Sequence, residues 1–300
     1  MASLKEIKQK IRSTVRTRTV TRAMEAVSAA KMRKSQNRAV GGRAYARAAL
    51  GALARVSGTK GLAGHPLATA RAVQKVLYIV ITSDKGLAGA LNSAVLRFAQ
   101  NDIKERALDN KSASIVAIGR KAYEHFHKRG FAIEAYHPNV DAVSAEVIGS
   151  VAAEAANRFA LGACDEVRIV YQNFVSTFEQ RPTMRTLFPL SLTELQKVVA
   201  DILPVRGAAS QPQEPASVAN YTVEPTEQEV FDAIIPKLAG IFVYHALLES
   251  QASEHSARMV AMKGASDKAG EMQHGLTLQF NKARQAAITR EVSEIIAGSL

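Results

Sequence analysis

The sequence has few of the residues that most catalytic or secreted domains depend on. Its 300 residues include one cysteine, no tryptophan and only 6% aromatic residues. With Cys164 alone, an internal disulfide is excluded and nothing indicates a cysteine-based metal site, so a reducing compartment is the expected setting. No run of about 18 apolar residues is free of charge, so the sequence predicts no membrane-spanning segment. Residues 1–10 carry four charges and show no apolar signal-peptide core.

Acidic residues are almost missing from the first fifth of the chain. Residues 1–60 hold fifteen Lys or Arg against Glu6 and Glu25, a local charge of +13, whereas the whole chain carries +12. A segment this basic requires an anionic neighbour, and nucleic acid, anionic lipid and an acidic protein surface are all candidates. Tyr45 is the one aromatic residue in this segment, which disfavours stacking on bases. A basic helical nucleic-acid-binding protein therefore stays as the alternative function.

Proline is missing from residues 3–57, where good helix formers predominate. The sequence predicts an N-terminal helix over 1–58, opened by Ser3 with Glu6 as its capping-box partner. A patch of threonines between Thr14 and Thr21 interrupts the apolar pattern. The predicted seam consists of apolar residues at roughly helical spacing: Leu4, Ile7, Ile11, Val15, Val20, Met24, Val27 and Met32.

A second long helix is predicted over 226–300, with no proline after Pro236. Met262, Ala269 and Leu276 lie seven residues apart, which indicates a heptad seam built largely from small residues. An uninterrupted helix over about 237–297 is roughly 90 Å long at 1.5 Å per residue. Such a rod must protrude from a chain of this size. We therefore expect the two terminal helices to pair as an antiparallel coiled coil.

The middle of the chain has a different pattern. Apolar, β-branched runs alternate with helical stretches over 74–190, which predicts a central α/β (Rossmann-like) domain with a mainly parallel sheet. Residues 204–220 are rich in Pro, Ala, Ser, Gln and Gly and predict a loop or linker. The expected strands are 76–82, 114–118, 131–136, 166–171 and 182–190.

Residues that could carry chemistry form no recognisable set. The loop 83–89 follows a strand, yet it has neither the GxGxxG nor the GxxxxGK[ST] spacing of phosphate-binding loops, so a tight turn is the favoured interpretation. A small-molecule enzyme built on the α/β domain is accordingly the third choice. The seven histidines are scattered, and Glu291 and Glu294 are expected to be exposed on the last helix turns. We predict no catalytic residue, no metal site and no cofactor.

Five stretches resemble one family, in the right order and over essentially the whole chain. They are IKQKIR at 7–12, TRAMEAVSAAKM at 21–32, ITSDKGLAGALN at 81–92, SEHSARMVAM at 253–262 and NKARQAAITREVSEIIAG at 281–298. Together they are similar to the gamma subunit of F-type ATP synthases.

This resemblance implies a mechanical subunit without an active site. The paired helices would form a shaft inside a ring of alpha and beta subunits. The α/β domain would meet the epsilon subunit and the c-ring, and no nucleic acid would be bound. The implied location is the cytoplasmic face of a bacterial inner membrane, as a peripheral membrane protein. The resemblance assigns the partner contacts to five residues: Met24, Arg284, Gln285, Thr289 and Glu291.

Overall fold

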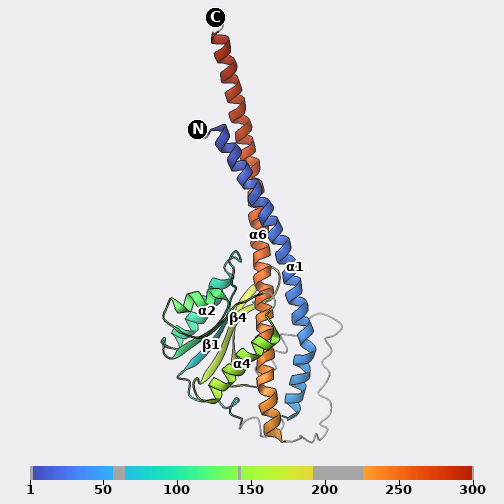
Figure 1. Ribbon diagram of the computed structural model, residues 1–300, viewed down its shortest axis with the longest axis vertical. Helices are drawn as coiled ribbons and strands as arrows, with labels where there is room; N and C mark the ends of the chain where they lie inside the picture. Colours follow the sequence, from blue (N-terminus) through green and yellow to red (C-terminus); the bar gives the residue numbers. More distant parts are fainter. Residues whose placement is uncertain (1–2, 57–64, 141–142, 192–225, 299–300) are drawn as a thin grey trace.

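The computed structural model describes residues 3–56, 65–140, 143–191 and 226–298. It places a five-stranded α/β domain beside two long antiparallel helices, α1 and α6, and so confirms the predicted fold class (Figure 1). The predicted linker over 204–220 lies outside the described residues. The elements are α1 (Leu4–Val56), β1 (Val76–Ile81), α2 (Leu91–Glu105), β2 (Ala113–Ile118), α3 (Arg120–His127), β3 (Ala132–His137), α4 (Ala145–Ala160), β4 (Glu166–Phe174), β5 (Gln180–Phe188) and α6 (Glu227–Gly298).

Helix α1 begins with the expected capping box. The Glu6 amide donates to Ser3 Oγ at 3.2 Å, and the Ser3 amide donates to Glu6 Oε2 at 3.2 Å. These two bonds satisfy donors that have no partner inside the first helical turn. The helix then continues through Gly41 and Gly42, and it packs chiefly against α6.

The buried seam of α1 differs from the predicted one. Val15, Val20 and Val27 are 38%, 57% and 54% exposed. Small polar residues are buried as well, because the buried and half-buried positions of α1 recur every three or four residues from Leu4 and reach Thr14 of the threonine patch. The Thr21 hydroxyl can be buried because it donates to the carbonyls of its own helix, to Thr17 O and Arg18 O, both at 3.0 Å. Among residues 4–39 of α1, the part of the helix whose side chains the structure describes, the buried residues are Ile7, Thr21, Ser28, Met32 and Ser35.

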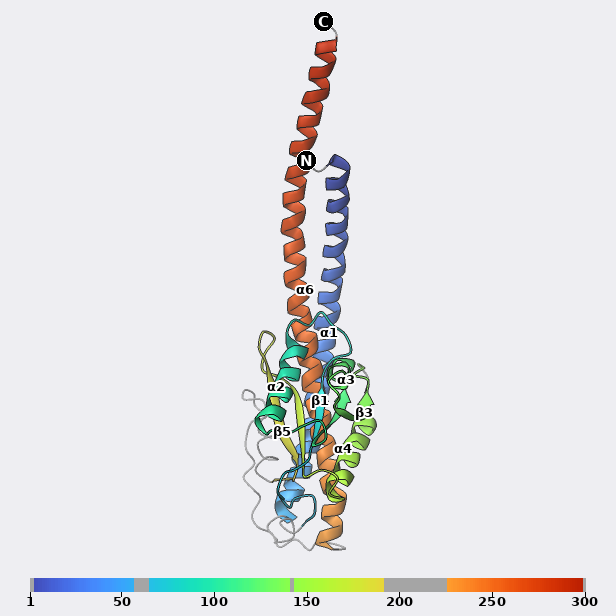
Figure 2. The same ribbon diagram turned by 90° about the vertical axis from the view of Figure 1, so that its left-hand side faces the viewer.

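Helix α6 has 72 residues and is about 108 Å long. It begins ten residues before the uninterrupted stretch predicted over 237–297 and passes through Pro236. Met262 and Ala269 of its predicted heptad seam are buried, 6% and 5% exposed, and Leu276 is half-buried. Beyond the start of α1 the helix continues as a single rod, and all residues of 288–298 are exposed (Figure 2).

The sheet has the order β3-β2-β1-β4-β5, in which the first four strands are parallel and β5 is antiparallel to β4. Alternate residues of β1 serve two cores. Leu77 and Ile79 pack with α4 and the lower part of α6, whereas Tyr78 and Val80 pack with α2 and α3. The sheet is thus covered on both faces, which explains its continuous apolar strands. Gly240 of α6 lets that helix approach α4 closely, since an added Cβ would lie 3.4 Å from the Gly149 Cα.

One described helix, α6, is long and apolar enough by composition to cross a membrane, and 44% of its most apolar window is buried inside the protein. The apolar side chains of this part of α6 include Phe231, Ile235 and Val243, which are fully buried against the sheet and α4. Helices of a soluble core meet the same compositional test. The apolarity of this part of α6 therefore follows from its place in the core.

Candidate partner-contact site

Four of the five predicted contact residues lie on the last turns of α6. Arg284, Gln285, Thr289 and Glu291 are all exposed there. The Thr289 hydroxyl donates to the Gln285 carbonyl at 3.0 Å, because residues four apart lie on one face of a helix. These side chains are available to another protein, and the rod beneath them is held by the upper end of α1.

Met24 lies away from this group. Arg18 of α1 bonds Gln273 of α6, so these two residues lie side by side on the antiparallel helices. Met24 lies six residues from Arg18 toward the α/β domain, and Arg284 lies eleven residues from Gln273 in the opposite direction. Seventeen residues of helix correspond to about 25 Å. Met24 is half-buried. The fold therefore presents two separate surfaces along the shaft.

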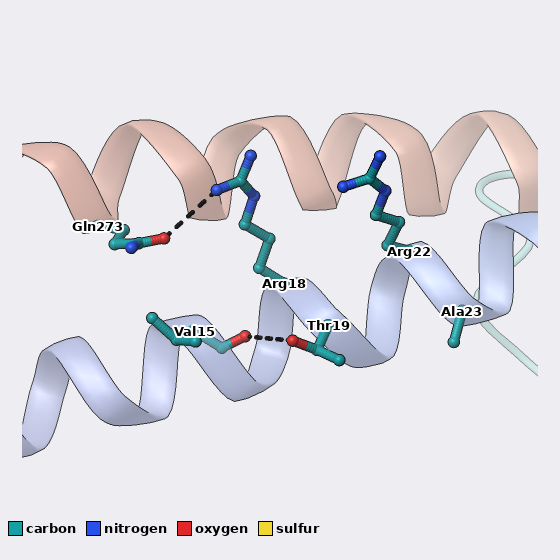
Figure 3. A pocket seen from close by; sticks show the side chains of 6 residues that line it. All are labelled: Val15, Arg18, Thr19, Arg22, Ala23 and Gln273. Atoms are coloured by element: carbon teal, nitrogen blue, oxygen red, sulfur yellow. Dashed lines mark hydrogen bonds between the residues drawn. The ribbon is translucent and has the colours of Figure 1, made fainter.

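A cationic cleft between α1 and α6 lies between these two surfaces, and the sequence did not reveal it. It has a volume of about 550 Å³, and Arg18 and Arg22 extend across it toward α6 (Figure 3). The Arg18 Nη1 donates to Gln273 Oε1 at 3.4 Å. Gly270 leaves room for this arginine, since an added Cβ would lie 3.4 Å from the Arg18 Cζ. The cleft is lined by Val15, Arg18, Thr19, Arg22, Ala23 and Gln273.

The electrostatics of the cleft favour an anionic group. Arg18 and Arg22 lie four residues apart on one helix face, where like charges destabilise a helix by about 0.2–0.5 kcal/mol. Both side chains are exposed. Glu271, the residue that follows Gly270, is engaged by Lys268, whose Nζ lies 2.7 Å from its Oε2. An acidic partner would relieve this repulsion. The spacing of the arginines is visible in the sequence, but their position beside Gly270 is not.

The solitary end of α6 is the second unusual surface. Ile288, Val292, Ile295 and Ile296 are 51%, 49%, 70% and 58% exposed. No acidic or basic side chain follows Glu294 in the described part of the helix. Nothing in the described part of the chain covers these residues. An end of this kind is suited to an apolar environment that another protein supplies.

Groups for catalysis or metal binding are not assembled in the part of the chain that the structure describes. No cluster of three or more His, Cys, Asp or Glu is placed there to hold a metal ion. Burial raises the pKa of the Cys164 thiol to about 11, so the thiol is neutral at physiological pH and a poor nucleophile. Burial, aided by the hydrogen bond to Asp102, also raises the pKa of Tyr78. Both groups belong to the packed domain.

Comparisons with known proteins agree with this arrangement. The ATP synthase family model matches residues 3–299. The ATP synthase gamma chain of Heliobacterium modesticaldum is 37% identical over 300 residues, which cover 100% of this chain and 99% of that protein.

Two solved structures share the fold. A chain of the Tetrahymena thermophila mitochondrial ATP synthase central stalk and c-ring has a TM-score of 0.59 at 23% identity, covering 82% of this chain and 99% of that chain. A chain of the Euglena gracilis mitochondrial ATP synthase rotor has a TM-score of 0.60 at 18% identity, covering 95% and 98%. From the family match and the full-length relative together, the chain belongs to the ATP synthase gamma-chain family.

Proposed function

We propose that the chain is the rotating central shaft of an F-type ATP synthase. In this role it couples proton-driven turning of the membrane c-ring to conformational cycling of the catalytic beta subunits. It is a non-catalytic subunit. The observation that carries the proposal is the solitary end of α6, an exposed rod that extends beyond every other described element. Its last described residues include Ile295, Ile296 and Ala297, which are apolar and uncharged, so they can turn inside an apolar collar with little electrostatic resistance.

The surfaces along the shaft support contacts with beta subunits. Arg284 can make a bidentate bond to a carboxylate, while Gln285 and Thr289 offer neutral hydrogen bonds. We infer that this group, with Glu291, engages one beta subunit in one rotary position and releases it in the next. Met24 would make a separate contact with a beta subunit, about 25 Å along the shaft from Arg284 toward the α/β domain.

The cationic cleft extends this account to the charge of α1. Residues 1–60 carry a local charge of +13, and Arg18 and Arg22 gather part of it in one place. An acidic loop of a surrounding subunit would offset this charge, because opposite charges attract more strongly where water is displaced. The same cleft argues against nucleic acid, since no aromatic side chain lines it for stacking.

The α/β domain would carry the remaining contacts, with the epsilon subunit and the c-ring. ATP synthase is a membrane-associated assembly, and we infer that this chain is a peripheral part of it on the cytoplasmic face of a bacterial inner membrane. The alpha and beta subunits would surround the upper shaft.

Co-purification tests the proposal. The full-length chain, carrying a tag on an exposed loop of the α/β domain, should bring down alpha, beta and epsilon subunits in an ATP-hydrolysing complex. The same chain should show no salt-dependent DNA binding at physiological ionic strength. Recovery of DNA binding without any ATP synthase subunit would favour the basic nucleic-acid-binding alternative.

A further inference from the structure

The α/β domain has a crevice at the position where related sheets bind ligands. The strand order β3-β2-β1-β4-β5 reverses direction between β1 and β4. In open α/β sheets, ligands bind outside the carboxyl ends of the strands at such a switch point. In this chain the carboxyl ends of β1 and β4 lead into the loops at 82–90 and 175–179.

The crevice is occupied by the chain's own helix α6. Residues 249–258 cross the carboxyl ends of both strands, and their polar side chains bond the loops on each side. These bonds include five that are donated by four side chains of α6. They run from Gln251 Nε2 to Asn139 Oδ1 at 2.8 Å and to Val140 O at 3.1 Å, from Ser253 Oγ to Gln172 O at 3.2 Å, from Ser256 Oγ to Thr177 O at 2.6 Å, and from Arg258 Nη2 to Gly86 O at 3.2 Å.

Amides at the N-terminus of α3, the helix that follows the neighbouring strand β2, are also bonded within the protein. The amide of Arg120 at the start of α3 donates to Asp84 Oδ1 at 2.7 Å, and the amide of Ala122 donates to Thr82 Oγ1 at 2.8 Å. Free helix N-terminal amides are what bind anions in such folds. Gly119 keeps the two loops close together, with a φ of 99° and room for no side chain, since a Cβ would lie 2.1 Å from Thr82 O.

The polar character of this contact is unusual for a helix on a sheet. Below it, α6 packs through apolar residues such as Phe231, Ile235 and Leu238. Within it, Ser253 and Ser256 are fully buried, and Gln251 and Arg258 are 4% and 7% exposed. Arg258 is neutralised by Glu254, whose Oε1 lies 2.6 Å from its Nη2. Buried polar groups are costly unless their partners are in place, so this segment has one favourable orientation.

Directionality distinguishes this contact from the apolar one below it. Apolar packing is non-directional and tolerates small rotations of a helix about its axis. Hydrogen bonds weaken steeply when their angles change. Because α1 packs chiefly on α6, a twisting load between the paired helices and the domain passes through α6. The bonds at 249–258 therefore resist rotation of the shaft relative to the domain.

We propose that α6 fills the switch-point crevice in place of a ligand, and that Gln251, Ser256 and Arg258 are positioning residues that lock the rotational angle of the shaft against the α/β domain. The inference rests on the proposed rotor function. It assigns the segment 249–258, hereafter the shaft joint, a role in transmitting torque. It also explains why this α/β domain need bind no nucleotide, since its binding crevice is already occupied.

The test is torsional stiffness in the assembled complex. A Lys111→Cys substitution places a label on an exposed turn of the α/β domain, and a bead attached there reports angular fluctuation while the alpha–beta ring is fixed to glass. The test variant is Gln251→Met with Ser256→Ala, which removes three bonds of the shaft joint and leaves the Arg258–Glu254 pair intact. The matched control is Gln279→Met with Thr277→Ala, on exposed positions of the same helix.

We expect the angular variance at rest to rise at least about twofold in the test variant, because angle-dependent bonds are lost, and to stay unchanged in the control. ATP-driven proton pumping per ATP hydrolysed should fall, while the melting temperature of the strand core stays close to that of the unmodified protein. An assembled test variant with unaltered stiffness would overturn the proposal. If the double variant fails to assemble, Ser256→Ala alone decides in the same way. Absence of rotation in the unmodified complex would instead reject the rotor function itself.

Discussion

A buried ion network beneath α2 allows one stability prediction to be worked out in detail. Glu166 begins β4 and is 6% exposed. Its Oε2 lies 2.6 Å from Arg106 Nη1, and its Oε1 lies 2.6 Å from Arg168 Nε. Arg168 also lies 2.6 Å from Asp102 Oδ1, so the network ties α2 to the sheet. Glu166→Gln keeps the shape of the side chain and removes its charge.

The expected cost follows from burial. Removing one partner of a fully buried pair costs about 3–5 kcal/mol. The Arg106 side chain is 30% exposed and Asp102 stays as a partner for both arginines, so we expect about 2–3 kcal/mol. For a domain of 150–250 residues this lowers the Tm by about 4–12 °C. Glu179→Gln is the matched control, because its pair with Arg181 is exposed, and it should cost less than about 1 kcal/mol.

Thermal unfolding followed by circular dichroism, together with amide hydrogen exchange of β1 and β4, measures both variants. Equal shifts in Tm for Glu166→Gln and Glu179→Gln would show that burial does not set the cost. The account of the α2 contact would then be wrong.

Four further predictions concern the shaft and the thiol. Met24→Lys adds a cation near a proposed acidic contact. The new exposed ion pair, worth about 0.2–1 kcal/mol, must break on each rotation, so ATP-driven proton pumping should fall more than ATP hydrolysis does. A fall in pumping that is strictly proportional to the fall in hydrolysis would reject this prediction. The triple change Arg284→Ala, Gln285→Ala and Thr289→Ala keeps helix propensity high, so the complex should assemble and bind nucleotide but lose most of its steady-state ATPase activity. Normal turnover in the assembled variant would show that these three residues do not make the proposed contact with a beta subunit. Cys164, with a pKa of about 11, should react with iodoacetamide at pH 8 at least about a hundredfold more slowly in the folded protein than in the unfolded chain. The contribution of the buried neutral thiol to the free energy of unfolding should decrease as pH rises from about 9 toward 11. Rapid labelling of the native chain would contradict both expectations. In the free chain, amides of both terminal helices should exchange faster than those of the sheet, and equal protection would count against the shaft assignment.

The sheet could be predicted from the sequence because its strands are buried on both faces. Val76–Ile81 is a continuous apolar run, and such runs admit few other structures in an α/β pattern. The α6 seam could also be predicted from the sequence, since Met262 and Ala269 are apolar at heptad spacing and are both buried.

The α1 seam was predicted correctly at Ile7 and Met32, which are buried, and wrongly at Val15, Val20 and Val27, which are exposed. Apolar residues identify the contact face of a helix only where the partner surface is also apolar. They fail to identify it where buried Ser or Thr hydroxyls can bond the backbone of their own helix. Thr21, Ser28 and Ser35 are buried because small side chains allow two helices to approach, and the Thr21 hydroxyl bonds its own backbone. Val20 and Val27 lie on the exposed face of α1.

The cationic cleft and the shaft joint could not be predicted, since each depends on contacts between distant parts of the chain. Arg18 meets Gln273 across 255 residues, and Arg258 meets Gly86 across 172. A periodic pattern identifies which face of a helix is buried. It does not identify which loop or helix that face meets.

Direct observation of rotation tests the central claim. With the alpha–beta ring fixed to a surface and a bead on the α/β domain at Lys111→Cys, addition of ATP should turn the bead in one direction through complete revolutions. A complex that hydrolyses ATP at its normal rate while the labelled chain stays at a fixed angle would contradict the assignment of this chain as the rotating shaft.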